Sequence, residues 1–98
     1  MTITTPAPAK FATPSHRELA RKMLCLPHDD MTAYRFGSIP KPRSSSYADC
    51  IAMVDAKMAV YTTYRRSKIF QLTRQGILAA LDPGESMDEK EFMEAALP

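Results

Sequence analysis

Residues 60 to 73 read VYTTYRRSKIFQLT, and this stretch constrains the fold more than any other part of the chain. Up to Met58, apolar residues recur every three to four positions, which is typical of helices. From Val60 onward, β-branched and aromatic residues dominate with a period of two, which is typical of strands. Two such runs flank the tetrapeptide RRSK. The stretch therefore predicts a β-hairpin with three positive charges at its tip.

The alternation also predicts which residues of the hairpin pair. A turn centred on the Arg-Ser dipeptide of RRSK would place Tyr61 opposite Leu72. It would likewise place Thr63 opposite Phe70, so that all four side chains share the face that packs on the core. No glycine stands in the turn, so a four-residue loop is expected rather than a two-residue turn of the primed type.

Helices are expected on both sides of the hairpin. A capping box, in which a hydroxyl and an acidic side chain three residues later satisfy free backbone N–H groups, recurs three times. These pairs are Ser15 with Glu18, Ser46 with Asp49, and Ser86 with Glu89. Thr73 follows the second strand and is a suitable N-cap for the next helix. The expected helices cover residues 15–26, 31–36, 47–58, 74–81 and 86–97.

The net charge of +2 conceals a strong asymmetry along the chain. Residues 1–81 hold 12 Lys/Arg and 5 Asp/Glu, a net of +7, whereas residues 82–98 hold 1 Lys and 6 Asp/Glu, a net of −5. A basic body suggests a polyanionic partner. The acidic end either engages the body or a second subunit, or it is simply a solvated helix face.

Residues 46–81 resemble the winged helix-turn-helix family of DNA-binding regulators. The match is best in IFQLTRQGILAAL, where an aromatic residue, a Leu-Thr pair and Gly76 lead from the second strand into a helix. The resemblance extends over residues 15–81. It implies an α+β fold that is mostly helical, with three helices, a β-hairpin wing, and one or two C-terminal helices. In that family the third helix enters the major groove and the wing lies against the backbone or the minor groove.

Taken with this resemblance, the sequence divides into three parts. Residues 1–13, which contain two prolines and little to bury, are expected to form a disordered arm. Residues 14–82 are expected to form the winged-helix-like domain, and residues 83–98 an acidic C-terminal helix. A length of 98 residues suits one such domain.

The resemblance implies a small regulator of transcription that binds double-stranded DNA as a dimer. Clustered Lys and Arg side chains of the wing and loop would neutralise phosphates, and any reading of bases would come from residues near Ser44 to Ala52. The expected DNA contacts are Lys41, Arg43, Ser45, Ser46, Tyr47, Arg65, Arg66 and Lys68.

The sequence departs from the family pattern in the expected third helix. Lys57-Met58-Ala59 stands where the family usually places a glycine before the wing. Outside its apolar stripe, the helix also offers Ala, Met and Asp, whereas base edges are read by Arg, Lys, Asn or Gln. This favours an alternative: a protein-binding module or small inhibitor on the same scaffold. Such a module would use the apolar third helix or the acidic C-terminal helix, which could also pair with a second copy. The expected contact residues of the acidic helix are Met87, Phe92, Met93 and Leu97.

Catalytic, metal and membrane functions find little support in the sequence. Cys25 and Cys50 are too few for a disulfide framework, and we expect two reduced, mostly buried thiols. Cys25 and His28 have a ligand-like spacing, but no second close pair completes a zinc site. We therefore expect no catalytic residues, no metal and no cofactor. No apolar run is long enough to span a membrane, and the N-terminus does not resemble a signal peptide, so a cytoplasmic location is expected.

Overall fold

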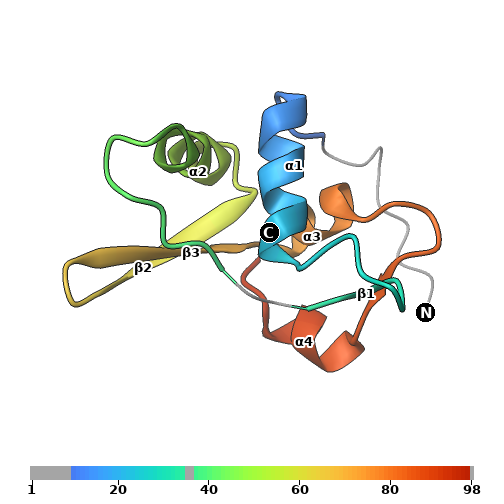
Figure 1. Cartoon of the computed structure of the whole chain (residues 1–98). Helices are drawn as coiled ribbons and strands as arrows, with labels where there is room; N and C mark the ends of the chain where they lie inside the picture. Colours follow the sequence, from blue (N-terminus) through green and yellow to red (C-terminus); the bar gives the residue numbers. More distant parts are fainter. Residues whose placement is uncertain (1–9, 35–36, 98) are drawn as a thin grey trace.

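The computed structural model describes residues 10–34 and 37–97. Helices and short strands alternate along the chain, so the expected α+β class is confirmed. Figure 1 shows α1 and α3 in the middle of the molecule, the β2–β3 hairpin projecting to one side beneath α2, and α4 at the bottom, below α1 and α3. The elements are α1 (Pro14–Met23), β1 (Thr32–Ala33), α2 (Ser45–Asp55), β2 (Ala59–Tyr64), β3 (Ser67–Leu72), α3 (Arg74–Ala80), β4 (Ser86–Met87) and α4 (Glu89–Glu94).

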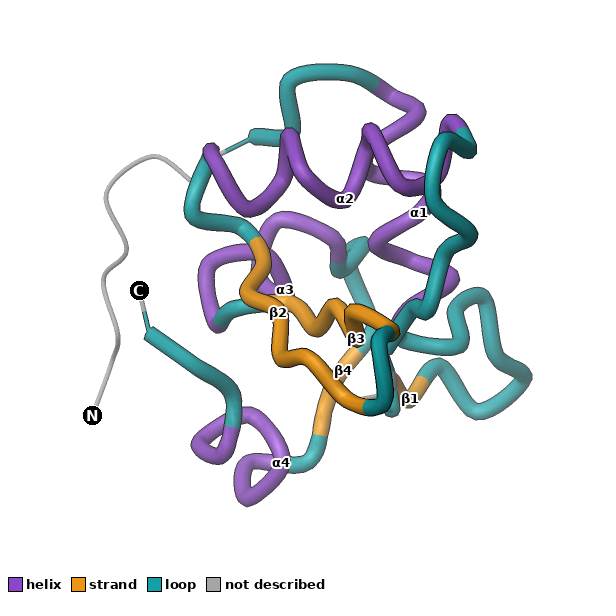
Figure 2. Tube along the Cα trace, turned by 90° about the vertical axis from the view of Figure 1, so that its left-hand side faces the viewer, coloured by secondary structure: helices purple, strands orange, loops and turns teal. Residues whose placement is uncertain are grey.

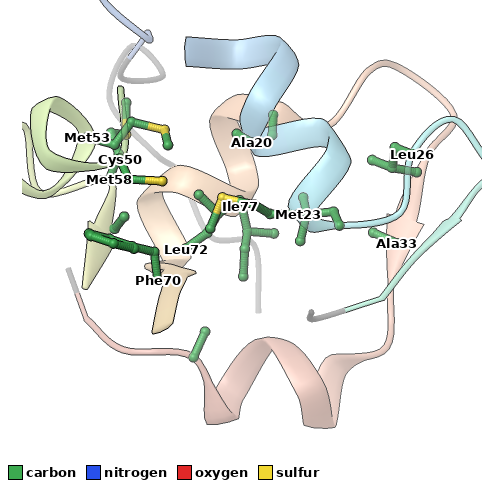
Figure 3. Packing of buried hydrophobic residues seen from close by; sticks show 14 residues of the cluster. Ala20, Met23, Leu26, Ala33, Cys50, Met53, Met58, Phe70, Leu72 and Ile77 are labelled. Atoms are coloured by element: carbon green, nitrogen blue, oxygen red, sulfur yellow. The ribbon is translucent and has the colours of Figure 1, made fainter. Parts of the chain in front are cut away.

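The core lies where the base of the hairpin meets the three longer helices. Phe70 and Leu72 of β3, Met23 of α1 and Ile77 of α3 are all buried there, and Figure 3 shows their side chains gathered in one cluster. The expected inward orientation of Phe70 and Leu72 is confirmed. Tyr61 is 44% exposed, because the outer part of the hairpin extends beyond the body that would cover it.

The hairpin forms as predicted, but its register differs by two residues. Tyr61 pairs with Phe70 rather than with Leu72. The expected four-residue loop is wrong, because Arg65 and Arg66 form a two-residue turn with φ angles of 47° and 69°. Positive φ at both turn positions matches the right-handed twist of the strands, and non-glycine residues can adopt it. A shift of two keeps every side chain on its predicted face.

The expected short helix at residues 31–36 is wrong in its described part. Thr32 and Ala33 instead form β1, which pairs in parallel with Ser86 and Met87 of β4. The remaining positions, 35 and 36, lie outside the described residues. The pairing joins segments about fifty residues apart, so no local sequence pattern in either segment predicts it.

The same pairing replaces the first turn of the expected last helix. Ser86 is extended, and Asp88 rather than Ser86 caps α4, accepting a hydrogen bond from the backbone N–H of Glu91 at 3.3 Å. α4 ends at Glu94 instead of continuing to Leu97. The predicted capping box is therefore wrong, and the predicted acidic helix is reduced to about half its length.

The first two N-caps also differ from the prediction. Thr13 caps α1 by accepting a hydrogen bond from the N–H of His16, and Pro14 occupies the first helical position. Ser44 caps α2 in the same manner. Ser15 is free of a capping role and donates its hydroxyl to Asp49 of α2 at 3.1 Å.

Both α1 and α2 end about three residues earlier than expected. In each case a non-glycine residue takes the left-handed conformation two positions after the helix end: Cys25 with φ 58° and Lys57 with φ 64°. Backbone bonds that close a Schellman motif follow, from Leu26 to the carbonyl of Arg21 and from Met58 to that of Met53, both at 2.8 Å. Lys57 thus takes the role of the glycine that the winged-helix pattern would place before the hairpin.

The junction of the hairpin with α3 is confirmed. Thr73 caps α3, accepting from the N–H of Gly76 at 3.2 Å, while its own hydroxyl donates to the carbonyl of Lys57 at 2.8 Å. A Cβ at Gly76 would lie 2.1 Å from the carbonyl oxygen of Met58. A glycine is therefore required for this close approach of helix and strand.

Candidate nucleic-acid interface

The tip of the hairpin is the most prominent basic feature of the described surface. Arg65 and Arg66 are exposed at the end of the projecting ladder. Figure 2, which looks toward this side of the molecule, shows the hairpin lying beneath α2. The guanidinium of Arg65 lies 5.4 Å from the centroid of the Tyr64 ring, and Tyr64 is itself 60% exposed. Both arginines can therefore reach an external anion without breaking an internal ion pair.

Lys68, also expected at the tip, is instead folded back on the hairpin. Its ammonium donates to the hydroxyl of Tyr47 at 3.0 Å and lies 4.8 Å from the centroid of the Tyr61 ring. The hydrogen bond to Tyr47 raises the pKa of Lys68 above its ordinary value. Tyr47 packs edge-on against Phe70, with ring centroids 5.9 Å apart. Two of the expected DNA contacts thus join α2 to the hairpin.

The loop before α2 supplies a second basic group. Lys41 and Arg43 are exposed, and the backbone of the loop is held by the hydroxyl of Ser44, which donates to the carbonyl of Lys41 at 2.7 Å. Ser45 is exposed, while Ser46 is half-buried beside α1. Figure 1 shows this loop on the same side of the molecule as the hairpin tip.

The segment containing this loop, α2 and the hairpin is positively charged as a unit. It holds six Lys/Arg and two Asp, a net of +4 over residues 37–73. Asp49, one of the two acids, is engaged with α1, where His16 approaches one carboxylate oxygen at 3.2 Å and the hydroxyl of Ser15 approaches the other. Of the two acids, only Asp55 is exposed. The field of this unit therefore favours anions.

The grouping of Ser15, His16 and Asp49 does not have the geometry of a catalytic triad. A nucleophilic serine must donate its proton to the imidazole, and the carboxylate must hold the other ring nitrogen. Here the hydroxyl and the imidazole both contact the carboxylate. The three side chains tie α1 to α2.

Two arginines of α1 are used inside the molecule. Arg21 donates to both carboxylate oxygens of Glu85, at 2.6 and 2.8 Å, and Arg17 pairs with Asp82. Hydrogen bonding by Arg21, supported by the backbone N–H of Asp82, lowers the pKa of Glu85 from 4.5 to about 2. The acidic end of the chain therefore engages the body, as one of the alternatives from the sequence proposed. These arginines are not part of a free basic surface.

The residues expected to contact a protein are divided by the structure. Met87 and Phe92 are partly buried and pack against the core, whereas Met93 is 55% and Leu97 is 70% exposed. Arg74 holds this region: its guanidinium donates to the carbonyl of Met93 at 2.6 Å, and its backbone N–H donates to that of Ala96. Only the last two of the four residues are placed for an external contact.

Sequence reasoning missed a groove of about 450 Å³ between the N-terminal segment, α1 and α3. Leu78 of α3 is 44% exposed there, because α3 is seven residues long and covers the core with one side only. Phe11, which also lines the groove and packs against the core, belongs to the segment expected to be a disordered arm. Residues 1–9 of that arm lie outside the described residues.

Cysteine and histidine chemistry is limited in the part of the chain that the structure describes. In residues 10–34 and 37–97, no three His, Cys, Asp or Glu side chains come close enough to hold a metal ion. Cys25 is exposed and Cys50 is buried, and both are free thiols. Burial is the main cause that raises the pKa of the Cys50 thiol.

No helix within the described ranges is long and apolar enough to cross a membrane. Comparisons with models of known families, with curated proteins and with solved structures found no match to this chain. Functional inference therefore depends on the geometry above.

Proposed function

We propose that this chain is a small winged-helix-like DNA-binding protein that holds the phosphate backbone of a duplex between its hairpin tip and the loop before α2. The observation that carries the proposal is that the arginines fall into two groups, one engaged within the molecule and one exposed. Arg17, Arg21 and Arg74 are committed to contacts within the molecule, whereas Arg65 and Arg66 are exposed at the end of a projecting hairpin. Among the described residues, the exposed arginines therefore lie at the hairpin tip and in the loop before α2.

The arrangement of α1, α2 and the hairpin supports the comparison with a winged helix. Ser38 exchanges both backbone hydrogen bonds with Phe70, each at 2.9 Å, and so adds a single β-bridge to the outer side of β3. This contact between the segment before α2 and the hairpin supports the comparison. The chain differs in having one helix, α2, between Ser38 and the hairpin, so α2 would be the element nearest the groove.

The proposed mode of binding relies on phosphates rather than on bases. Apart from Ser45, the exposed positions of α2 are Ala48 and Asp55, and neither side chain can donate to a base edge. Lys41, Arg43 and the two tip arginines can neutralise phosphates, and such contacts position a protein without reading sequence. We therefore expect little discrimination between duplex sequences.

The test is a salt titration of duplex binding, followed by fluorescence anisotropy. Wild type is compared with a tip variant carrying Arg65→Ala and Arg66→Ala, and with a control carrying Lys22→Ala and Lys90→Ala. The control removes the same charge from exposed positions on α1 and α4. If both tip arginines contact phosphates, the slope of log affinity against log salt decreases by about 1.8 in the tip variant. The control keeps the wild-type slope.

Two outcomes would contradict the proposal. One is the absence of duplex binding by wild type at about 20 mM salt, where counterion release favours binding most strongly. The other is an equal loss in both variants, which would reflect net charge rather than the hairpin tip.

The alternative proposal, a protein-binding module or small inhibitor, has one observation in its favour. Met93 and Leu97 present exposed apolar side chains four positions apart in sequence at the acidic end of the chain. Such residues are typical contacts for a protein partner. Failure of duplex binding at low salt, together with loss of a captured protein partner on Met93→Ser with Leu97→Ser, would favour this alternative.

A further inference from the structure

The outer edge of the hairpin offers unpaired backbone groups. Phe70 uses both its N–H and its C=O on Ser38, so these groups point away from β2. The Tyr61–Phe70 pair is therefore a non-hydrogen-bonded pair of the β2–β3 ladder. It follows that the N–H and C=O of Tyr61 point to the other side of β2, and by alternation those of Thr63 do so as well. Among the described residues, β2 pairs with β3 alone.

This edge lacks the features that normally protect an edge strand. Natural sheets place lysine, proline or a bulge on such edges, or make the strand very short. β2 is six residues long, its ladder is regular, and residues 60–64 contain no charged residue and no proline. All five of these residues are exposed, including Val60, Tyr61 and Tyr64 among the large side chains.

We propose that β2 pairs with β2 of a second copy of this chain, antiparallel and centred on Thr62. This register joins groups that are free in both copies, because Tyr61 of one copy faces Thr63 of the other and the two exchange backbone hydrogen bonds. On the other face of the joined sheet, the side chain of Val60 lies across from that of Tyr64 of the second copy. The Thr62 side chains of the two copies lie across from each other. Aromatic with β-branched residues, and Thr with Thr, are favourable cross-strand pairs, so the strand complements itself.

Charge also favours a second copy in this orientation. An antiparallel pair centred on Thr62 separates the two Arg65–Arg66 tips by roughly 20 Å, which exceeds the Debye length of about 8 Å at physiological salt. A parallel pair would place the two tips side by side. Because an added strand pair buries less than a standard interface of about 1,600 Å², we expect a dissociation constant in the micromolar range or weaker. This interface differs from the pairing of acidic helices expected from the sequence.

The test is sedimentation equilibrium from about 5 µM to about 1 mM, without nucleic acid, so that it is independent of DNA binding. Thr62→Lys places two ammonium groups face to face across the two-fold axis. Ser67→Lys is the matched control, because it adds the same charge to the same face of the hairpin on β3, away from the open edge. We expect a reversible dimer for wild type and for Ser67→Lys, and at least a tenfold higher dissociation constant for Thr62→Lys.

Amide hydrogen exchange provides a second measurement on the wild-type chain and needs no variant. The amides of Tyr61 and Thr63 should become more protected as concentration rises, whereas the amide of Thr62, already directed toward β3, should not change. A chain that stays monomeric to 1 mM would overturn the proposal. So would a dimer that is indifferent to Thr62→Lys, or one in which exchange at Tyr61 and Thr63 does not depend on concentration.

Discussion

Replacing Glu85 with glutamine would test whether the acidic end of the chain is part of the folded body. The Glu85 side chain is 6% exposed, and its carboxylate accepts hydrogen bonds from both terminal nitrogens of Arg21 and from the backbone of Asp82. Glu85→Gln keeps the size of the side chain but removes its charge. It also turns an amide NH₂ group toward donors, so at least one of these bonds is lost.

The expected loss follows from the pKa of Glu85. A decrease from 4.5 to about 2 is linked to about 3 kcal/mol of stability for the charged form. Arg21 keeps a second contact with Asp82, which is half exposed and screened by solvent, so part of its attraction survives. We therefore expect Glu85→Gln to lower the free energy of unfolding by about 2 kcal/mol, or Tm by roughly 10 °C for a chain of this size.

Urea unfolding between pH 2 and pH 7 measures this effect and its sign. Because the pKa of Glu85 is lower in the folded state, its contribution is present above about pH 4.5 and is lost as pH decreases toward 2. Wild type and Glu85→Gln should thus differ most above pH 5 and converge near pH 2. Glu18→Gln, which removes a carboxylate from an exposed position on α1, should stay within about 0.5 kcal/mol of wild type.

A Glu85→Gln variant that unfolds within about 0.5 kcal/mol of wild type at pH 7 would show that the Glu85 carboxylate does not stabilise the fold. A constant difference between the two proteins over the whole pH range would contradict the linkage of stability to the Glu85 carboxylate.

Three further predictions concern the start of α3 and the two thiols. Gly76→Ala should cost about 2–4 kcal/mol in urea unfolding, because its Cβ would lie 2.1 Å from a backbone oxygen; a loss below 1 kcal/mol would show that α3 can move away. Thr73→Ala should cost about 2 kcal/mol, since it removes a cap and leaves the carbonyl of Lys57 without its donor, whereas Thr73→Ser should keep most of the stability. With a thiol reagent, Cys25 should react at once and Cys50 only on unfolding; fast reaction of both would contradict the burial of Cys50.

The hairpin and the start of α3 could be predicted because their signals are local. Alternation of side chains along residues 60–72 specifies two strands and their faces, and these agree with the structure despite the shift in register. Thr73 and Gly76 combine a cap with a close approach, and both have the predicted role. The sequence was sufficient to predict these two elements, because a few neighbouring residues determine their backbone conformation.

The ends of α1 and α2 and the hairpin turn were predicted less well, because residues other than glycine adopt positive φ there. Cys25, Lys57, Arg65 and Arg66 all adopt positive φ, a conformation normally expected of glycine or asparagine. The identities of these four residues alone do not predict a positive φ. The Schellman bonds that end α1 and α2, and the two-residue turn of the hairpin, became evident only from the backbone.

Long-range pairing explains the remaining differences. The β1–β4 pair and the Arg21–Glu85 contact join segments more than fifty residues apart in sequence. The first replaced an expected helix, and the second, together with the Arg17–Asp82 pair, engages two arginines of the basic body within the molecule. Lys68 was likewise expected to face a phosphate, but the Tyr47 hydroxyl and two aromatic rings hold it on the hairpin. The charge asymmetry of the chain was visible in the sequence, whereas its internal pairing was not.

The most direct test of the proposed interface is an NMR titration of the ¹⁵N-labelled chain with a duplex at low salt. DNA bound between the hairpin tip and the loop before α2 should shift the amides of residues 41–46 and 64–68 most strongly. Residues 82–97, where the acidic side chains concentrate, should keep their shifts. Shifts confined to residues 82–97, or no shifts at a duplex excess, would contradict the account.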